Sequence, residues 1–106
     1  MIAYYYRSAN FDQDKQSRAV MGFVQHAAQN NIKSYCVLID DACSGMDENR
    51  AGYEALVNRM IDGTITGVYT PTIEHISRDT TTAMRFLDLA KKKNVSVNFM
   101  EQDANE

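Results

Sequence analysis

The chain opens with a short run of apolar and aromatic residues, and three similar runs follow at intervals along it. Each run is rich in β-branched or aromatic side chains, and polar or glycine-containing segments separate one run from the next. This composition over a few residues is typical of β-strands. The pattern predicts strands over residues 2–7, 34–40, 65–70 and 95–100.

Between these runs the apolar residues recur at helical rather than strand spacing. In the second such segment Tyr53, Leu56, Met60 and their neighbours keep the i, i+3, i+4, i+7 spacing of one helix face. Capping residues suggest where each helix begins and ends. We expect helices from Asp12 to about Asn30, from Asp47 or Asn49 to Gly63, and from Asp79 or Thr80 to about Lys92.

Regular alternation of strand and helix indicates right-handed βαβ units and a parallel sheet. We therefore predict an α/β fold: a doubly wound, mostly parallel four-stranded sheet in the order 2-1-3-4, with helices on both faces. Ligands of such sheets bind beyond the carboxyl ends of the strands, where the strand order reverses. The loops to inspect are therefore residues 7–13, 40–50 and 70–79.

Size and charge narrow the class of protein. A chain of 106 residues is enough for one domain, here residues 1–106, and its net charge of −3 argues against a freestanding nucleic-acid binder. No apolar run is long enough to cross a membrane and no signal peptide is visible, so we expect a cytoplasmic protein without membrane contact. We interpret Cys36 and Cys43 as reduced thiols.

The three candidate loops each carry one arginine together with polar side chains. The residues of interest are Arg7, Ser8 and Gln13, then Asp40, Asp41, Ser44 and Arg50, then Glu74, His75 and Arg78. Arginines gathered at one sheet edge repel one another unless an anion or carboxylates lie among them. Because a guanidinium can bind phosphate through two hydrogen bonds, a phosphodiester is a reasonable ligand.

Simpler interpretations of the same residues remain open. Each arginine can be an ordinary surface residue or can pair with Asp41 or Glu74. Ser8 can be a small polar residue at a strand end, and His75, which has no second histidine or cysteine beside it, can be merely solvated. Two other doubly wound folds fit the loops poorly. A receiver domain needs acidic residues after its first and third strands, and this sequence has none at those places. A flavodoxin needs a phosphate-binding loop after its first strand, and this sequence has no such loop there.

Three stretches resemble the motifs of one family. They are YYRSANFDQ (5–13), DACSGMDENR (41–50) and EHISRD (74–79). In this order they resemble the Y-x-R-x-S, D-x-x-S-G and D-R-L-x-R motifs of the serine recombinases, the resolvase/invertase family, in their N-terminal catalytic domain. The run RAGYEALVNRMIDGTITGV (50–68) is also similar to the segment that follows the D-x-x-S-G motif in that family. The resemblance therefore covers nearly the whole chain.

The resemblance implies a resolvase-like fold and site-specific DNA strand exchange. In this family a serine hydroxyl attacks a DNA phosphodiester, and arginines stabilise the charge of the transition state without a metal or other cofactor. The resemblance also implies DNA and another recombinase subunit as partners. The implied catalytic residues are Arg7, Ser8, Gln13, Asp41, Ser44, Arg50 and Arg78.

Two departures from the family motifs bear on activity. The family serine stands two residues after its arginine, and here that place is Ala9 while Ser8 is one residue closer. If the strand continues regularly, Ser8 should point away from the side of Arg7. In the second departure, Glu74 and His75 stand where the family motif has an aspartate and an arginine. His75, which is mostly neutral at pH 7, therefore replaces an arginine.

A third difference concerns length. These 106 residues do not include the dimerisation helix or the helix-turn-helix DNA-binding domain expected in the family. We therefore expect the domain to contact DNA as part of a longer parent protein. We therefore expect a recombinase catalytic domain that is impaired or inactive in this form, with weak DNA affinity of its own. The alternative is a non-enzymatic interaction or regulatory module derived from a recombinase.

Overall fold

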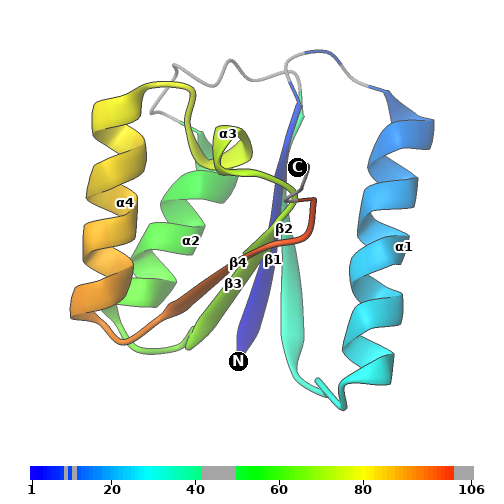
Figure 1. Cartoon of the computed structure of the whole chain (residues 1–106), viewed down its shortest axis with the longest axis horizontal. Helices are drawn as coiled ribbons and strands as arrows, with labels where there is room; N and C mark the ends of the chain where they lie inside the picture. The colour runs from blue at the N-terminus through cyan, green and yellow to red at the C-terminus, as the bar shows by residue number, and fades with distance from the viewer. Residues whose placement is uncertain (9, 11, 42–49, 102–106) are drawn as a thin grey trace.

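Four parallel strands form one sheet at the centre of the molecule. The computed structural model describes residues 1–8, 10, 12–41 and 50–101. The strands are β1 (Ile2–Arg7), β2 (Tyr35–Asp40), β3 (Gly67–Thr70) and β4 (Ser96–Phe99). They lie in the order β2-β1-β3-β4, and all three pairings are parallel (Figure 1). The predicted strand order and direction are confirmed.

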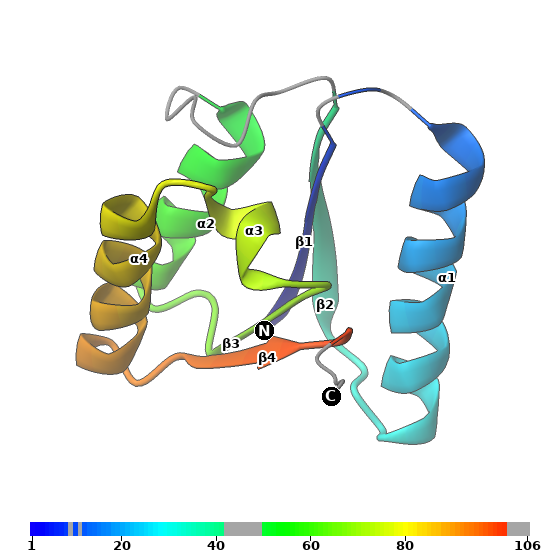
Figure 2. The ribbon, with the colours of Figure 1, turned by 45° about the horizontal axis from the view of Figure 1, so that its top comes forward.

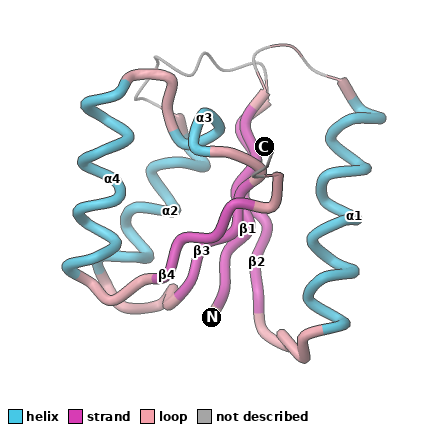
Figure 3. Tube along the Cα trace, in the orientation of Figure 1, coloured by secondary structure: helices cyan, strands magenta, loops and turns pink. Residues whose placement is uncertain are grey.

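Helices cover both faces of this sheet, as predicted. α1 (Gln13–Gln29) lies alone on one face, and α2 (Ala51–Ile61) and α4 (Thr80–Lys92) lie on the other (Figure 2). The connections that lead from α1, α2 and α4 into the next strand lie together at one end (Figure 3). The carboxyl ends of the strands therefore meet at the opposite end, which leaves that end for a site.

The alternating side chains of β1 supply two separate cores. Tyr4 and Tyr6 point to the side of α1, where Tyr4 stacks on Phe23 with ring centroids 4.9 Å apart. Ala3 and Tyr5 point to the other side and pack with buried residues of α2 and α4. Because both faces of β1 are buried, its run of tyrosines is a consequence of a central position in the sheet.

Two of the predicted helix starts are confirmed by capping hydrogen bonds. The Asp12 side chain accepts from the Lys15 amide at 3.1 Å, and the Asp79 side chain accepts from the Thr82 amide at 3.0 Å. Both carboxylates satisfy amides that have no partner inside the helix. The predicted stop of α2 is also confirmed, because Gly63 follows the helix with a positive φ of 83°.

The start of α2 differs from the prediction. The proposed capping residues Asp47 and Asn49 lie outside the described residues, and the helix begins at Ala51 after Arg50, whose side chain makes no capping bond. A distant carboxylate replaces the local cap: Asp40, at the end of β2, accepts from the amides of Gly52 and Tyr53. The acceptor for the first amides of α2 is therefore a residue that is distant in the sequence, and not a local capping residue.

One short element was not predicted. α3 (Ile73–Ile76) is a single helical turn inside the expected loop 70–79, and it lies against the carboxyl end of β1. None of the helices within the described ranges is both long enough and apolar enough to span a membrane.

Candidate functional site

A cavity of about 740 Å³ opens at the carboxyl end of β1, between the start of α1 and the α3 turn. Most of its lining side chains are polar or charged. They are Tyr6, Arg7, Ser8, Asn10, Asp12, Gln13, Lys15, Glu74, His75 and Arg78. Four of the seven predicted catalytic residues therefore lie in one place: Arg7, Ser8, Gln13 and Arg78.

Arg7 is the buried cation of the cavity. It is the last residue of β1, only 8% of its surface is exposed, and its Nη2 donates to the Glu74 carbonyl of α3 at 2.9 Å. Burial lowers the pKa of Arg7 from its usual range, and the charges of Arg50 and Arg78 lower it further. A positive charge that is desolvated and near two like charges gains from an added anion.

Ser8 is among the residues that line the cavity beside Arg7, and the expectation that its side chain faces away from Arg7 stays a prediction. The expectation assumed a regular strand, but β1 ends at Arg7, so the alternation of side chains need not continue to Ser8. The Ser8 amide donates to the Asp40 carbonyl at 3.1 Å. Its Oγ is shielded from solvent and has no hydrogen-bond partner among the described residues. Ala9, which occupies the family's serine position, lies outside those residues.

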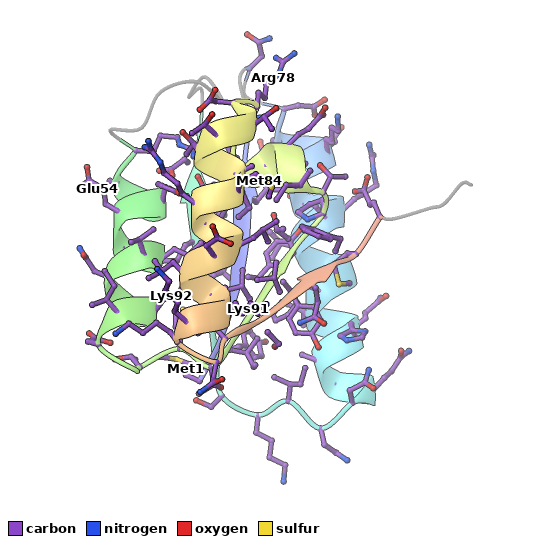
Figure 4. All side chains as sticks on the ribbon, turned by 60° about the vertical axis from the view of Figure 1, so that its left-hand side comes forward. Met1, Glu54, Arg78, Met84, Lys91 and Lys92 are labelled. Atoms are coloured by element: carbon purple, nitrogen blue, oxygen red, sulfur yellow. The ribbon has the colours of Figure 1, made fainter. Side chains whose placement is uncertain are left out.

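Arg78 differs from Arg7 in its exposure. It precedes α4 and is exposed to solvent, and Figure 4 shows it projecting at one end of the molecule, whereas Lys91 and Lys92 lie in the last turn of α4. Because it lines the same cavity as Arg7, the two guanidinium groups approach that space from different elements. Gln13, the first residue of α1, is exposed at the rim.

Arg50 is not among the described residues that line the cavity. It is only 1% exposed, and its guanidinium donates to the carbonyls of His75 (3.3 Å) and Ile76. The guanidinium carbon also lies 4.6 Å from the centroid of the Tyr53 ring, a cation–π geometry. Three arginines do gather near this end of the sheet, as expected, but Arg50 bonds to carbonyls of the α3 turn.

Asp40 is the residue that sequence reasoning undervalued. This buried carboxylate accepts from the Tyr5 hydroxyl at 2.7 Å, the Gly52 amide at 2.8 Å and the Tyr53 amide at 2.9 Å. A Cβ on Gly52 would lie 2.9 Å from both carboxylate oxygens, so this close approach requires glycine. Burial and the hydrogen bond to Asp40 raise the pKa of Tyr5 far above its usual range.

Asp41, in the middle motif, is not among the described residues that line the cavity. Asp41 follows β2 directly and is exposed, and Ser44 lies outside the described residues. A signal for Asp40 was present in the sequence, because an acidic residue that ends an otherwise apolar strand is expected to be buried and hydrogen-bonded. The motif spacing directed attention to Asp41 instead.

His75 is a neutral wall of the cavity. Burial, with smaller effects from Arg7 and Lys15, lowers the pKa of His75 to about 4. Its Nδ1 lies 3.1 Å from the Thr72 Oγ1, and its ring centroid lies 5.0 Å from that of Tyr6. Near neutral pH this side chain offers a ligand a hydrogen bond and no positive charge.

The chemistry of these side chains suits an anion better than a cation. Within the described parts of the chain, no three histidine, cysteine, aspartate or glutamate residues gather as a metal site would require. Beside the carboxylates of Asp12 and Glu74, the lining residues carry two guanidinium groups, one ammonium group and two hydroxyls, which are hydrogen-bond donors suited to phosphate oxygens.

Comparison with known proteins identifies the family. The model of the resolvase N-terminal domain matches residues 2–106. The chain belongs to the resolvase family. This resolvase domain matches no curated protein sequence at a significant level.

Solved structures confirm the resolvase fold. The C-terminal catalytic domain of ISC1926 TnpA, an IS607-like serine recombinase, is 18% identical with a TM-score of 0.83, over 99% of this chain and 70% of that one. The N-terminal catalytic domain of TP901-1 integrase is 15% identical with a TM-score of 0.83, over 93% and 76%. The first open reading frame of transposon ISC1904 from Sulfolobus solfataricus P2 is 16% identical with a TM-score of 0.77, over 99% and 70%.

These identities are low, so the structural likeness establishes the fold of the resolvase domain and not its activity. Together with the family match, it confirms the prediction of a serine-recombinase catalytic domain with strand order 2-1-3-4.

Proposed function

We propose that this resolvase domain binds a DNA phosphodiester in the cavity at the end of β1, and that its power to exchange strands is impaired. The supporting observation is that Arg7, Arg78 and Ser8 line one cavity, although they come from two distant segments of the chain. The buried Arg7 provides a fixed charge, and the exposed Arg78 can adjust to the ligand.

The proposed roles follow from burial. Arg7 and Arg78 hold the phosphate oxygens and stabilise the charge that grows during attack at phosphorus. Gln13, at the rim, helps to orient the DNA. Arg50 acts as a positioning residue because it bonds to the carbonyls of the α3 turn rather than lining the cavity. Asp41 and Ser44 are proposed from the family motif alone.

Impairment follows from two replacements. Ala9 has no hydroxyl at the family's nucleophile position, and a neutral His75 stands where the family motif has an arginine. Removing one donor from a transition-state cradle costs roughly 3–4 kcal/mol, so the second change alone is serious. Both changes act on the same chemical step, and their effects need not add.

One observation favours a second candidate, in which Ser8 is the nucleophile. Ser8 is one of the residues that line the cavity, and its buried Oγ has no hydrogen-bond partner among the described residues. In that case a bond forms between Ser8 Oγ and phosphorus while a phosphorus–oxygen bond to one deoxyribose breaks. The serine proton leaves to solvent, and the released deoxyribose oxygen takes up a proton. An error of about 1 Å in this geometry can cost a hundredfold in rate.

The partners of the domain follow from the same proposal. DNA would be brought to the cavity through a longer parent protein, with another recombinase subunit beside it, in the cytoplasm and without a small-molecule cofactor. If the cavity does no chemistry, the domain serves as an interaction or regulatory module that pairs with an active recombinase.

Trapping of a covalent protein–DNA adduct on a suicide substrate tests this proposal. The domain would be grafted onto the dimerisation helix and DNA-binding domain of an active family member. We expect no adduct from the unmodified graft, no change with Ser8→Ala, and partial recovery with Ala9→Ser combined with His75→Arg. An adduct from the unmodified graft that Ser8→Ala abolishes would instead establish Ser8 as the nucleophile.

A further inference from the structure

A second hollow of about 350 Å³ adjoins the cavity on the side of α1. Its lining residues are Tyr6, Lys15, Arg18, Ala19, His75 and Glu101. Tyr6, Lys15 and His75 also line the main cavity, so these three side chains form the wall that the two hollows share. A ligand in one hollow is therefore next to a ligand in the other.

The second hollow has its own basic side chains. Lys15 and Arg18 are three residues apart on α1, which places them on the same side of that helix, and both are exposed. Lys15 is near His75, since its charge contributes to the lowered pKa of that ring. Ala19, also on α1, lines the hollow as well.

We propose, on the basis of the proposed function, that the hollow at Arg18 holds the phosphate next to the one in the main cavity. The domain would then bind two consecutive phosphodiesters of one DNA strand. Phosphates repeat along a strand, so a protein that follows the backbone needs basic sites in a row. Lys15, in the shared wall, contacts both phosphates, whereas Arg78 serves only the first and Arg18 only the second.

Acidic side chains set the strength of this second subsite. Glu101 lines the hollow at Arg18, and Asp12 and Glu74 line the main cavity. Because a carboxylate repels a phosphate, Glu101 should weaken binding there. The proposal therefore makes two opposite predictions: Arg18→Gln weakens binding of the second phosphate, and Glu101→Gln strengthens it.

Titration of the intact chain with two thymidine oligonucleotides tests the subsite. TpT carries one phosphodiester and TpTpT carries two, and weak binding of both can be followed by amide chemical shifts at low salt. We expect TpTpT to bind about fivefold more tightly than TpT, as one added exposed charge contact allows. Arg18→Gln should abolish this advantage and leave TpT binding unchanged.

The control is Lys92→Gln, which removes the same charge at the end of α4 that lies away from Arg78 (Figure 4). It should leave both affinities and their ratio as they are. Glu101→Gln should raise the affinity for TpTpT more than that for TpT. With a longer single strand, Arg18→Gln should lower the slope of log K against log salt by about 0.7.

Failure of the subsite and failure of the proposed function give different results. If TpT binds in a manner that depends on Arg78 but Arg18→Gln behaves like Lys92→Gln, the second subsite is wrong and the phosphodiester site stands. If Arg78→Gln leaves the binding of TpT unchanged, or TpT does not bind, the proposed function is wrong and the second subsite falls with it.

Discussion

Two neighbouring regions of this resolvase domain contain arginines from the same set of motifs but differ in how far their polar side chains are bonded within the protein. Arg50 belongs to a hydrogen-bonded cluster with Asp40, Tyr5, Gly52 and Tyr53, which we call the Asp40 cluster; the side chains of Arg50, Asp40 and Tyr5 are buried in it. In the cavity, by contrast, Arg78 is exposed, and the Ser8 Oγ has no hydrogen-bond partner among the residues described.

The difference teaches that a motif arginine near a site can act by shaping it rather than by touching a ligand. The Asp40 cluster joins the end of β2 to the start of α2, and Arg50 extends the connection to the α3 turn. Arg7 then bonds to the same turn from the other side, through the Glu74 carbonyl. Changes in the Asp40 cluster should therefore affect stability, and changes in the cavity should affect binding.

The largest expected effect comes from Asp40→Ala. This variant leaves the Tyr5 hydroxyl and the amides of Gly52 and Tyr53 without their acceptor, in a buried place. Such losses each cost about 1–3 kcal/mol, so we expect the free energy of unfolding to fall by about 4 kcal/mol. Urea denaturation measures it, with Asp41→Ala as the control.

Asp41 is exposed at the next position, so its replacement should change the free energy of unfolding by no more than about 0.5 kcal/mol. Equal losses for the two variants would show that the Asp40 cluster does not have the structural role assigned to it. Asp40→Asn, which keeps the shape of the side chain, should lie between the two.

A smaller effect is expected from pH at the boundary between the two regions. His75 has a folded-state pKa of about 4, below the usual 6.5, so the folded state resists protonation. The contribution of His75 to the free energy of unfolding is therefore fully present above about pH 6.5. It is lost as the pH drops toward 4, because the unfolded chain takes up the proton first. Since solvent screens the partly exposed ring, we expect a loss of about 2 kcal/mol across this window.

Urea denaturation at several pH values, compared with His75→Gln, isolates this contribution. Carboxylates titrate in both proteins alike, so the difference between the two curves belongs to His75. A difference that stays constant from pH 7 to pH 4 would contradict the neutral, desolvated state of this ring.

Sequence reasoning reached the fold because local patterns determined it. Apolar periodicity located all four strands and three of the helices, and Asp12 and Asp79 marked two helix starts by short-range capping. It missed α3, a single turn with too few residues to show a period. It also missed the start of α2, because Asp40 caps that helix from twelve residues away.

The candidate site was predicted only in outline. Topology brought Arg7 and Arg78 to one end of the sheet, as parallel strands require. The burial of Arg50 depends on tertiary packing against Tyr53 and the α3 carbonyls, which no local pattern encodes. The direction of the Ser8 side chain stays a prediction, because β1 ends at Arg7 and the alternation of a strand need not continue to Ser8.

The smallest effect on stability, and the most direct test of the account, concerns Arg78. Two quantities would be measured for Arg78→Gln: the free energy of unfolding in urea and the affinity for TpT at low salt. We predict a change in unfolding free energy within about 0.5 kcal/mol and a loss of affinity of about tenfold, since one charge-assisted bond to phosphate is removed. Unchanged affinity for TpT would contradict the central claim that this cavity binds a DNA phosphodiester.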